Sequence, residues 1–211
     1  MSASSQIWAS GCPYRSGHMS FINTTALEDK LDIKEISRRR ALFIPMDGVQ
    51  MPQRAWLEEG KKLPGTEFYL VSGGYMAVSD EFIDLLNEFD IGAPLSDGPG
   101  KDRVEFHPLT IDDHTMTKEL DRAHILHVAV RKPCVDFEAS AAVDRIGKSH
   151  LWSPGIVLED KLVVNETAQT GADLWAAQDL TRTLFFSDRL KSAIEARGWS
   201  RIKFERCRMA E

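Results

Sequence analysis

The sequence predicts an α+β protein whose mixed sheet, or pair of sheets, carries two related strand-helix-strand units. Residues 76–86 show a pattern of apolar residues, a serine and acidic residues. A pattern with similar spacing recurs over residues 184–194. Each copy is followed by a second short apolar run, at residues 104–106 and 202–204. This order of patterns is typical of a helix laid on a sheet, once in each half of the chain.

The first strand and the helix start of each unit follow from residue types. Residues 76–78 and 184–186 are apolar runs with strand-forming residues, and a serine follows each run. Ser79 and Ser187 stand where a helix N-cap belongs, because their hydroxyls can accept hydrogen bonds from free amides of the first turn. Acidic residues follow both serines, at the positive end of the helix dipole.

Both predicted helices carry apolar residues at helical spacing, so one face of each should pack on a sheet. Gly198 is expected just after the second helix, as a left-handed C′ residue. The first unit has about ten extra residues, near 91–100, whose glycines and prolines mark a loop. The predicted core-facing residues are Phe82, Leu85, Leu86 and Phe89 in the first helix, and Leu190, Ala193 and Ile194 in the second.

The remaining elements are shorter and less regular. Residues 24–40 have an imperfect helical spacing, and Gly73 and Gly74 should break the chain before the first unit. Strands are expected at residues 6–8, at 41–45 where Pro45 ends the run, at 67–71, at 123–130, and at 156–158 and 162–164 on either side of a turn at 159–161.

No low-complexity tract or long charged linker divides the chain. We therefore expect an N-terminal segment, residues 1–20, and a single α+β domain, residues 21–211. The repeated units lie near residues 67–109 and 183–207 of this domain. One shared sheet, or two packed sheets, should join the two halves.

Composition restricts the class of protein. A chain of 211 residues with 43% hydrophobic content can bury a full core. The net charge of −6 argues against direct nucleic-acid binding and is compatible with an acidic face for a basic partner. Cys12, Cys134 and Cys207 are few and widely spaced, which indicates a reducing compartment. Without a signal peptide or an apolar run of membrane-spanning length, we expect a cytoplasmic protein with no membrane partner.

Motifs for catalysis or cofactor binding are weak. Ser79 lacks the flanking glycines of a nucleophile elbow, and the sequence around Lys101 lacks the first glycine and the Ser or Thr of a phosphate loop. His124 and His127, three apart in one predicted strand, should point to opposite faces. The histidines and cysteines offer no closed ligand set by spacing, so we expect neither a metal nor an organic cofactor.

Acidic residues are the candidate binding groups. Glu88 and Asp90 lie in the last turn of the first predicted helix, where each carboxylate faces the negative end of the dipole at a cost of about 0.3–1 kcal/mol. Two interpretations stay open: a solvated helix end, or a rim that contacts a protein partner. The candidate partner-binding residues are Glu88, Asp90, Asp97, Asp102, Asp112, Asp113, Glu119 and Asp121.

The paired units resemble a family of bacterial polymorphic-toxin immunity proteins, numbered eleven among the immunity families and formerly a domain of unknown function. The resemblance is strongest over residues 184–206, with residues 78–109 as the upstream partner. Residues 123–130, and the D-x-x-x-S stretch from Asp136 to Ser140, are similar to the stretch between the two units in such proteins. The resemblance covers about residues 50–207.

This resemblance implies a stoichiometric inhibitor, not an enzyme, that binds a cognate secreted toxin and neutralises it in the producing cell. A nuclease is one class of toxin whose basic surface would suit an acidic face. One alternative is a small hydrolase or nucleotide-modifying enzyme with a site assembled from His107, His114 and Asp112. Another is a structural or assembly component. A convergent polar pocket with strongly shifted titrations would favour the enzyme.

Overall fold

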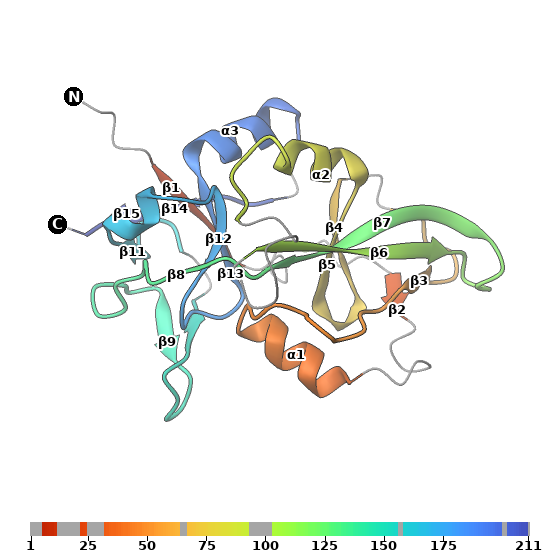
Figure 1. Ribbon diagram of the computed structural model, residues 1–211, viewed down its shortest axis with the longest axis horizontal. Coiled ribbons are helices and arrows are strands. Elements are labelled where there is room, and N and C mark those ends of the chain that lie inside the picture. The colour runs from red at the N-terminus through yellow and green to blue at the C-terminus, as the bar shows by residue number, and fades with distance from the viewer. Residues whose placement is uncertain are drawn as a thin grey trace.

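The computed structural model describes residues 6–11, 22–24, 32–63, 67–92, 103–155, 158–199 and 202–210. In this part of the chain, the strands form two main sheets and two small pairs (Figure 1). The first sheet has the spatial order β2 (Ile22–Thr24), β3 (Arg54–Leu57), β6 (Val104–Asp112), β7 (Glu119–Val128), β5 (Tyr75–Val78) and β4 (Phe68–Val71). The second has the order β14 (Glu205–Arg206), β1 (Ile7–Gly11), β13 (Thr183–Ser187), β12 (Leu174–Ala177) and β8 (Arg131–Lys132).

Three α-helices accompany these sheets in the described residues, and the predicted α+β class is confirmed. They are α1 (Ile33–Ala41), α2 (Asp80–Leu86) and α3 (Asp188–Ala196). The described part of the chain also contains the 3-10 turns η2 (Ser72–Gly74) and η4 (Glu166–Gln169). It further contains the strand pairs β9 (Val143–Arg145) with β10 (Trp152–Pro154) and β11 (Val163–Val164) with β15 (Arg208–Met209). None of the described helices is long and apolar enough to cross a membrane.

The two strand-to-helix corners form as predicted. The Ser79 hydroxyl accepts a hydrogen bond from the Phe82 amide at 3.3 Å, and the Ser187 hydroxyl accepts one from the Leu190 amide at 3.2 Å. Phe82 and Leu190 are both buried. Gly198 follows α3 with φ +74°, in the left-handed conformation expected of a C′ residue.

Each cap should contribute measurably to stability. We expect Ser79→Ala to lower the free energy of unfolding by about 1 kcal/mol, because it leaves the Phe82 amide without its acceptor. Ser37→Ala, at an exposed position inside α1, is the control and should cause no loss because alanine is the better helix former. Chemical denaturation of the two variants tests this, and equal midpoints would contradict the cap.

The two units have the same topology, but the strand in the middle of each comes from a different part of the sequence. The unit strands β5 and β6 are both antiparallel to β7, which lies between them, and β13 and β14 are both antiparallel to β1. Each helix therefore connects two strands across a third. That third strand follows the first unit in sequence, whereas for the second unit it is β1, at the start of the chain.

The segment over residues 1–20 thus supplies the middle strand of the second unit. Ala9 pairs with Phe185 on one side and Glu205 on the other, and Ile7 and Ala9 belong to the main hydrophobic core. We propose that the domain includes β1.

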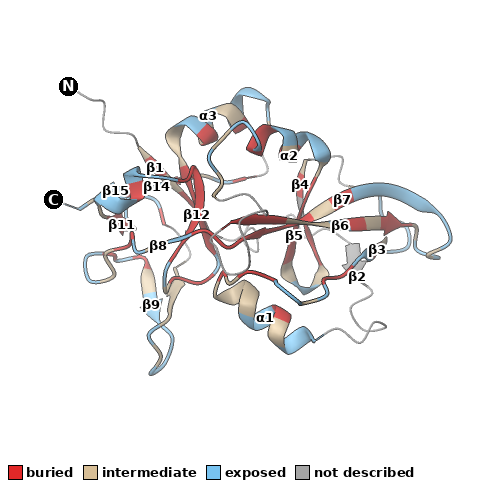
Figure 2. Ribbon diagram, viewed as in Figure 1, coloured by how far each residue is buried: buried red, intermediate tan, exposed pale blue. Residues whose placement is uncertain are grey.

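A common core joins the two sheets. Helices α2 and α3 lie side by side over one face, with α1 on the opposite side (Figure 1). The Phe82 ring of α2 packs against Trp199 after α3, with ring centroids 5.4 Å apart. Buried residues of both sheets, including Val128 and Trp175, belong to this one cluster (Figure 2). A second cluster around Ile36 packs α1 against the other face of the six-stranded sheet.

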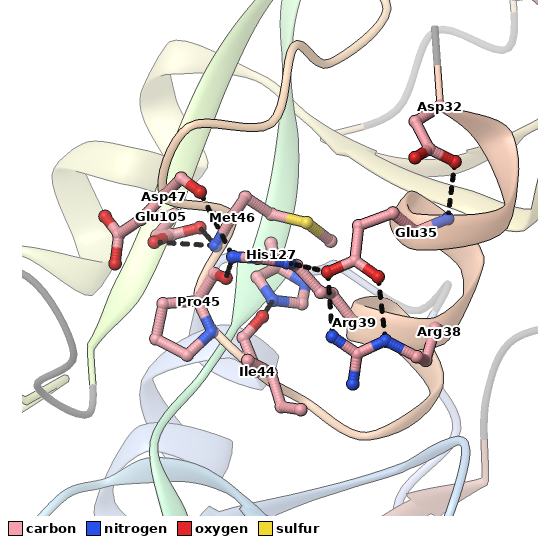
Figure 3. A network of polar contacts seen from close by, with 10 residues as sticks. All are labelled: Asp32, Glu35, Arg38, Arg39, Ile44, Pro45, Met46, Asp47, Glu105 and His127. Carbon is pink, nitrogen blue, oxygen red and sulfur yellow. Dashed lines mark hydrogen bonds and ion pairs between the residues drawn. The ribbon is translucent and has the colours of Figure 1, made fainter.

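The strand expected over residues 41–45 is wrong. Helix α1 runs to Ala41, and Phe43 adopts φ +52°. Tertiary hydrogen bonds hold the segment that follows (Figure 3). The Arg39 guanidinium donates to the Pro45 carbonyl at 2.6 Å, and the Ile44 carbonyl accepts from His127 at 2.8 Å. Burial lowers the pKa of His127 to about 4, so this imidazole is neutral and can donate to the carbonyl.

Residues 202–204 form no strand either, although residues 104–106 do begin β6. Pairing with β1 starts only at Glu205. Ile202 is buried, and Phe204 packs edge-on against Phe186 at 5.1 Å. The apolar side chains of this run therefore pack in the core, although its backbone does not pair with a strand.

Other expectations are met where the structure describes them. Strands occur at residues 7–11, 68–71, 119–128 and 163–164, a turn occupies residues 159–161, and Gly73 and Gly74 both have φ +77°. Residues 156–157, and the insert over residues 93–100, lie outside the described residues.

The D-x-x-x-S stretch is a turn that supports a strand. The Asp136 carboxylate accepts from the amides of Glu138 and Ala139, and the Ser140 hydroxyl donates to the Asp136 carbonyl at 2.5 Å. The same hydroxyl accepts from the Val163 amide of β11 at 2.9 Å. This stretch therefore has a structural role.

Candidate protein-binding surface

The hairpin of β6 and β7 extends beyond β5, its neighbour on the β7 side (Figure 1). Strand β5 pairs with β7 only from Leu126 to His124, where Val78 ends it. Beyond that point, residues 119–122 are all exposed, whereas β7 is largely buried further in (Figure 2). The outer half of β7 is thus paired with β6 on one side alone, within the described part of the chain.

The backbone direction at this edge follows from two hydrogen bonds. Ala129 donates to the Arg103 carbonyl, and Thr110 donates to the Gln53 carbonyl on the β3 side. The N–H and C=O groups of successive residues in a strand point alternately to its two neighbours. The odd-numbered residues of β6 therefore direct these groups toward β7. Arg122 lies opposite Thr110 and therefore directs its N–H and C=O away from β6. Its N–H donates instead to the Asp121 carboxylate at 2.8 Å.

The acidic residues at this end of the hairpin have different roles. Asp113 organises the loop, because its carboxylate accepts from the Thr115 hydroxyl and the amides of Thr117 and Lys118. Desolvation opposes ionisation, but these hydrogen bonds outweigh it and lower the pKa of Asp113. Glu119 forms an exposed ion pair with Arg122 at 2.7 Å. These residues and Asp121 place carboxylates at the surface.

Asp112 is placed differently from the acids that follow it. It is 3% exposed, and its carboxylate pairs with Arg54 at 2.7 Å. The Arg54 guanidinium also donates to the Met116 carbonyl, which ties β3 to the hairpin loop. The Asp112 carboxylate is therefore engaged in an ion pair within the protein.

Glu88 and Asp90 lie near the other end of β6. The bridge between Gly92 and Arg103 places the segment that follows α2 beside the first residues of this strand. Nine residues of β6 then lead to Asp112, a span of about 30 Å. The structure therefore brings Asp112, Asp113, Glu119 and Asp121 together, and separates them from Glu88 and Asp90. Asp97 and Asp102 lie outside the described residues.

Glu88 and Asp90 do not lie in the last turn of the helix as expected, because α2 ends at Leu86 with Asn87 as its C-cap. Internal partners also offset the unfavourable position of these two acids. Glu88 pairs with Arg197 at 3.0 Å, just after α3. The Asp90 carboxylate accepts from the Gly92 amide at 3.0 Å, and the Asp90 amide donates to Asp173. The dipole penalty expected at this helix end is therefore compensated within the fold.

A buried carboxylate that sequence reasoning missed lies beside this helix end. The Asp173 side chain is 3% exposed and accepts from the Arg189 guanidinium, the Ser187 hydroxyl at 2.5 Å and the Asp90 amide at 2.9 Å. Burial opposes its ionisation, but these donors outweigh burial and lower the pKa of Asp173. The carboxylate joins the end of α2, the start of β12 and the first turn of α3.

The residues required by the enzyme alternative are not brought together. His107 lies on β6 with its Nε2 3.4 Å from the buried Glu105 carboxylate, and His114 lies in the hairpin loop. The intervening strand separates these histidines by about 20 Å. Among the described side chains, no group of three His, Cys, Asp or Glu could hold a metal ion.

The chain matches a known protein family. The model of an immunity protein family, Imm11, matches residues 38–209. The match includes both repeated units and strand β7 between them, and it begins after β1. No curated protein matches the chain.

Proposed function

This chain belongs to the Imm11 immunity protein family, and from that membership we propose that it is an antidote to one secreted bacterial toxin. It binds the toxin directly in the cytoplasm of the producing cell and blocks it as a stoichiometric inhibitor, without catalysis or a cofactor. The family match carries this proposal. The separation of His107 from His114 supports it against the enzyme alternative.

We further propose that the hairpin end makes the first contact with the toxin. Asp113, Glu119 and Asp121 offer surface carboxylates beside the open edge of β7. An extended segment of the toxin could add to this edge through backbone hydrogen bonds at Arg122. We also propose contacts at Glu88 and Asp90, which follow α2, and at Asp97 and Asp102. A basic toxin surface, such as that of a nuclease, fits the net charge of −6.

Association kinetics with the toxin encoded beside this gene test both proposals. The variant Asp113→Asn, Glu119→Gln, Asp121→Asn should bind about tenfold more slowly at low ionic strength, because complementary charge steers the encounter. The difference should shrink at about 0.5 M salt, where charges are screened within a few ångströms. The control Glu138→Gln, Asp144→Asn, Glu166→Gln makes the same charge change at exposed sites elsewhere and should leave the rate within about twofold.

The two possible failures are distinct. Absence of any complex at micromolar concentration would refute the antidote function. A tight complex whose association rate is the same in both triple variants would refute only the hairpin contact.

A further inference from the structure

The segment that follows α1, residues 42–47, lies against β6 and β7 without pairing with either strand in the described part of the chain (Figure 3). We call this segment the α1 strap. Its Ile44 carbonyl accepts from the His127 imidazole at 2.8 Å, and its Met46 amide donates to the Glu105 carboxylate at 3.0 Å. Side chains of the sheet therefore hold the backbone of the strap in place of a strand ladder.

Packing beside the strap is incomplete, and its backbone is strained. A cavity of about 470 Å³ is lined by Ala41 and Phe43, together with Met76 of β5 and Leu184 of β13. Ala41, Phe43 and Ile44 also line a smaller pocket of about 120 Å³. Phe43 has φ +52°, a conformation that is unfavourable for an aromatic residue. Empty space and strain both lower the cost of moving the strap away from the sheet.

His127 is the titratable group beneath the strap, and it is 2% exposed. Burial lowers the pKa of this imidazole from its ordinary value, about 6.5, to about 4, and the hydrogen bond to Ile44 opposes burial only in part. The Ile44 carbonyl covers the ring at Nε2. The closed strap therefore keeps His127 neutral at a pH where a hydrated imidazole would begin to take up a proton.

The charged groups around His127 and the strap come from α1, from β6 and from the strap itself, and they are Arg40, Arg103, Glu105, His107 and Asp47. Glu105 favours a proton on His127, whereas His107 and Arg40 oppose it. Burial opposes the ionisation of Glu105, but His107, the Met46 amide and Arg103 outweigh burial and lower the pKa of this carboxyl. Glu105 is thus ionised above about pH 5, so His127 is the group that titrates first as the pH falls.

We propose that the α1 strap is a pH-sensitive device, which opens when His127 takes up a proton. In the closed strap, the neutral imidazole donates to the Ile44 carbonyl away from water. In the open strap, the ring is hydrated and beside the Glu105 carboxylate, so the imidazolium is stable there. This device goes beyond toxin binding and does not depend on it.

The sign of the pH dependence follows from the two states of His127. Its pKa is lower in the closed strap than in the open one, so the closed form is fully favoured above about pH 6.5. That preference is lost as the pH falls from about 6.5 toward about 4. Because opening takes up one proton in this range, the open fraction should rise about tenfold per pH unit below about pH 6.

Amide hydrogen exchange of the full-length protein, followed by NMR, measures the opening. The protection factor of the Met46 amide divides the intrinsic exchange rate by the measured rate, and so removes the direct effect of pH on exchange. It should fall about tenfold per pH unit between about pH 6 and about pH 5. At each pH it should also be at least about tenfold lower than that of Ala123, which lies in the ladder of β6 and β7 and reports on opening of the sheet.

Two variants identify the titrating group. His127→Gln keeps a side-chain N–H donor for the Ile44 carbonyl but does not titrate, so its Met46 protection should change by less than about twofold over the same range. The control His107→Gln removes the other histidine of this cluster and should keep the fall seen in the native protein. Cooperative thermal unfolding of each variant establishes that it is folded.

Three results would overturn the proposal. One is a Met46 protection factor in the native protein that does not change with pH, which needs no variant to observe. Another is equal protection of Met46 and Ala123, because the strap would then open only with the whole sheet. The third is the same fall with pH in His127→Gln as in the native protein.

Discussion

Replacing Asp173 by alanine should lower the free energy of unfolding by about 3 kcal/mol, with a range of about 2–5 kcal/mol. The substitution leaves the Ser187 hydroxyl and the Asp90 amide without their acceptor, and Arg189 without its ion pair. Because Asp173 joins three elements, the loss should affect the whole cooperative transition.

Urea denaturation at neutral pH measures this difference. The control is Asp160→Asn, which removes the charge of an ion pair with Arg206 of 2.7 Å whose side chains are both about half exposed, and which keeps a residue that tolerates the φ of +53° at this position. An exposed pair contributes at most about 1 kcal/mol, so the control should lose much less stability. Equal losses in the two variants would contradict the assigned role of Asp173.

The pH dependence gives a second measure of the same carboxylate. The pKa of Asp173 is lowered in the folded protein, so its contribution is complete above the ordinary pKa of an aspartate, about 4. That contribution is lost as the pH falls through the lower folded value. The stability difference between the native protein and Asp173→Ala should therefore be constant near neutrality and shrink below about pH 4. A difference that grows with acidification would contradict the sign.

Ile7→Ala should lower the free energy of unfolding by about 2–5 kcal/mol, the range for removing a large buried aliphatic side chain. Ile7 is 1% exposed and packs in the common core from the middle strand of the second unit. If residues 1–20 were only an appended segment, the same substitution would have almost no effect.

The matched control is Ile146→Ala, since Ile146 is 42% exposed beyond β9. It should change stability by no more than about 0.5 kcal/mol. Thermal and urea denaturation of both variants separate the loss of a packed side chain from a general effect of removing isoleucine. A control loss as large as that of Ile7→Ala would contradict the assignment of β1 to the core.

Local patterns predicted the elements whose causes are local. Ser79 and Ser187 mark helix starts because a cap bonds an amide three residues ahead, and apolar spacing then gives the buried face. The strand predicted over residues 41–45 is wrong because contacts from Arg39 and His127 decide the conformation of this segment. The place of β1 was unpredictable for the same reason, since no local pattern encodes which distant strands it pairs with.

For the candidate surface, the sequence shows which residues are acidic but does not predict what surrounds each of them in the fold. Asp112 and Asp113 are adjacent and alike in sequence, yet one is buried against Arg54 and the other organises an exposed loop. Whether Glu88 is free depends on Arg197, more than a hundred residues away. The cavity could not be predicted either, because its walls come from α1, β5 and β13, which only the tertiary fold brings together.

The position of β1 also determines the order in which the chain can fold during synthesis. The hairpin of β6 and β7 closes over a few residues, so it can form soon after it leaves the ribosome. Ile7 is made about 180 residues before its partner Ser187. The five-stranded sheet therefore forms late and has a high contact order. Until it forms, β1 lacks β13 and β14, the strands that pair with it. The second half of a nascent chain therefore becomes native only after β13 and β14 have left the ribosome.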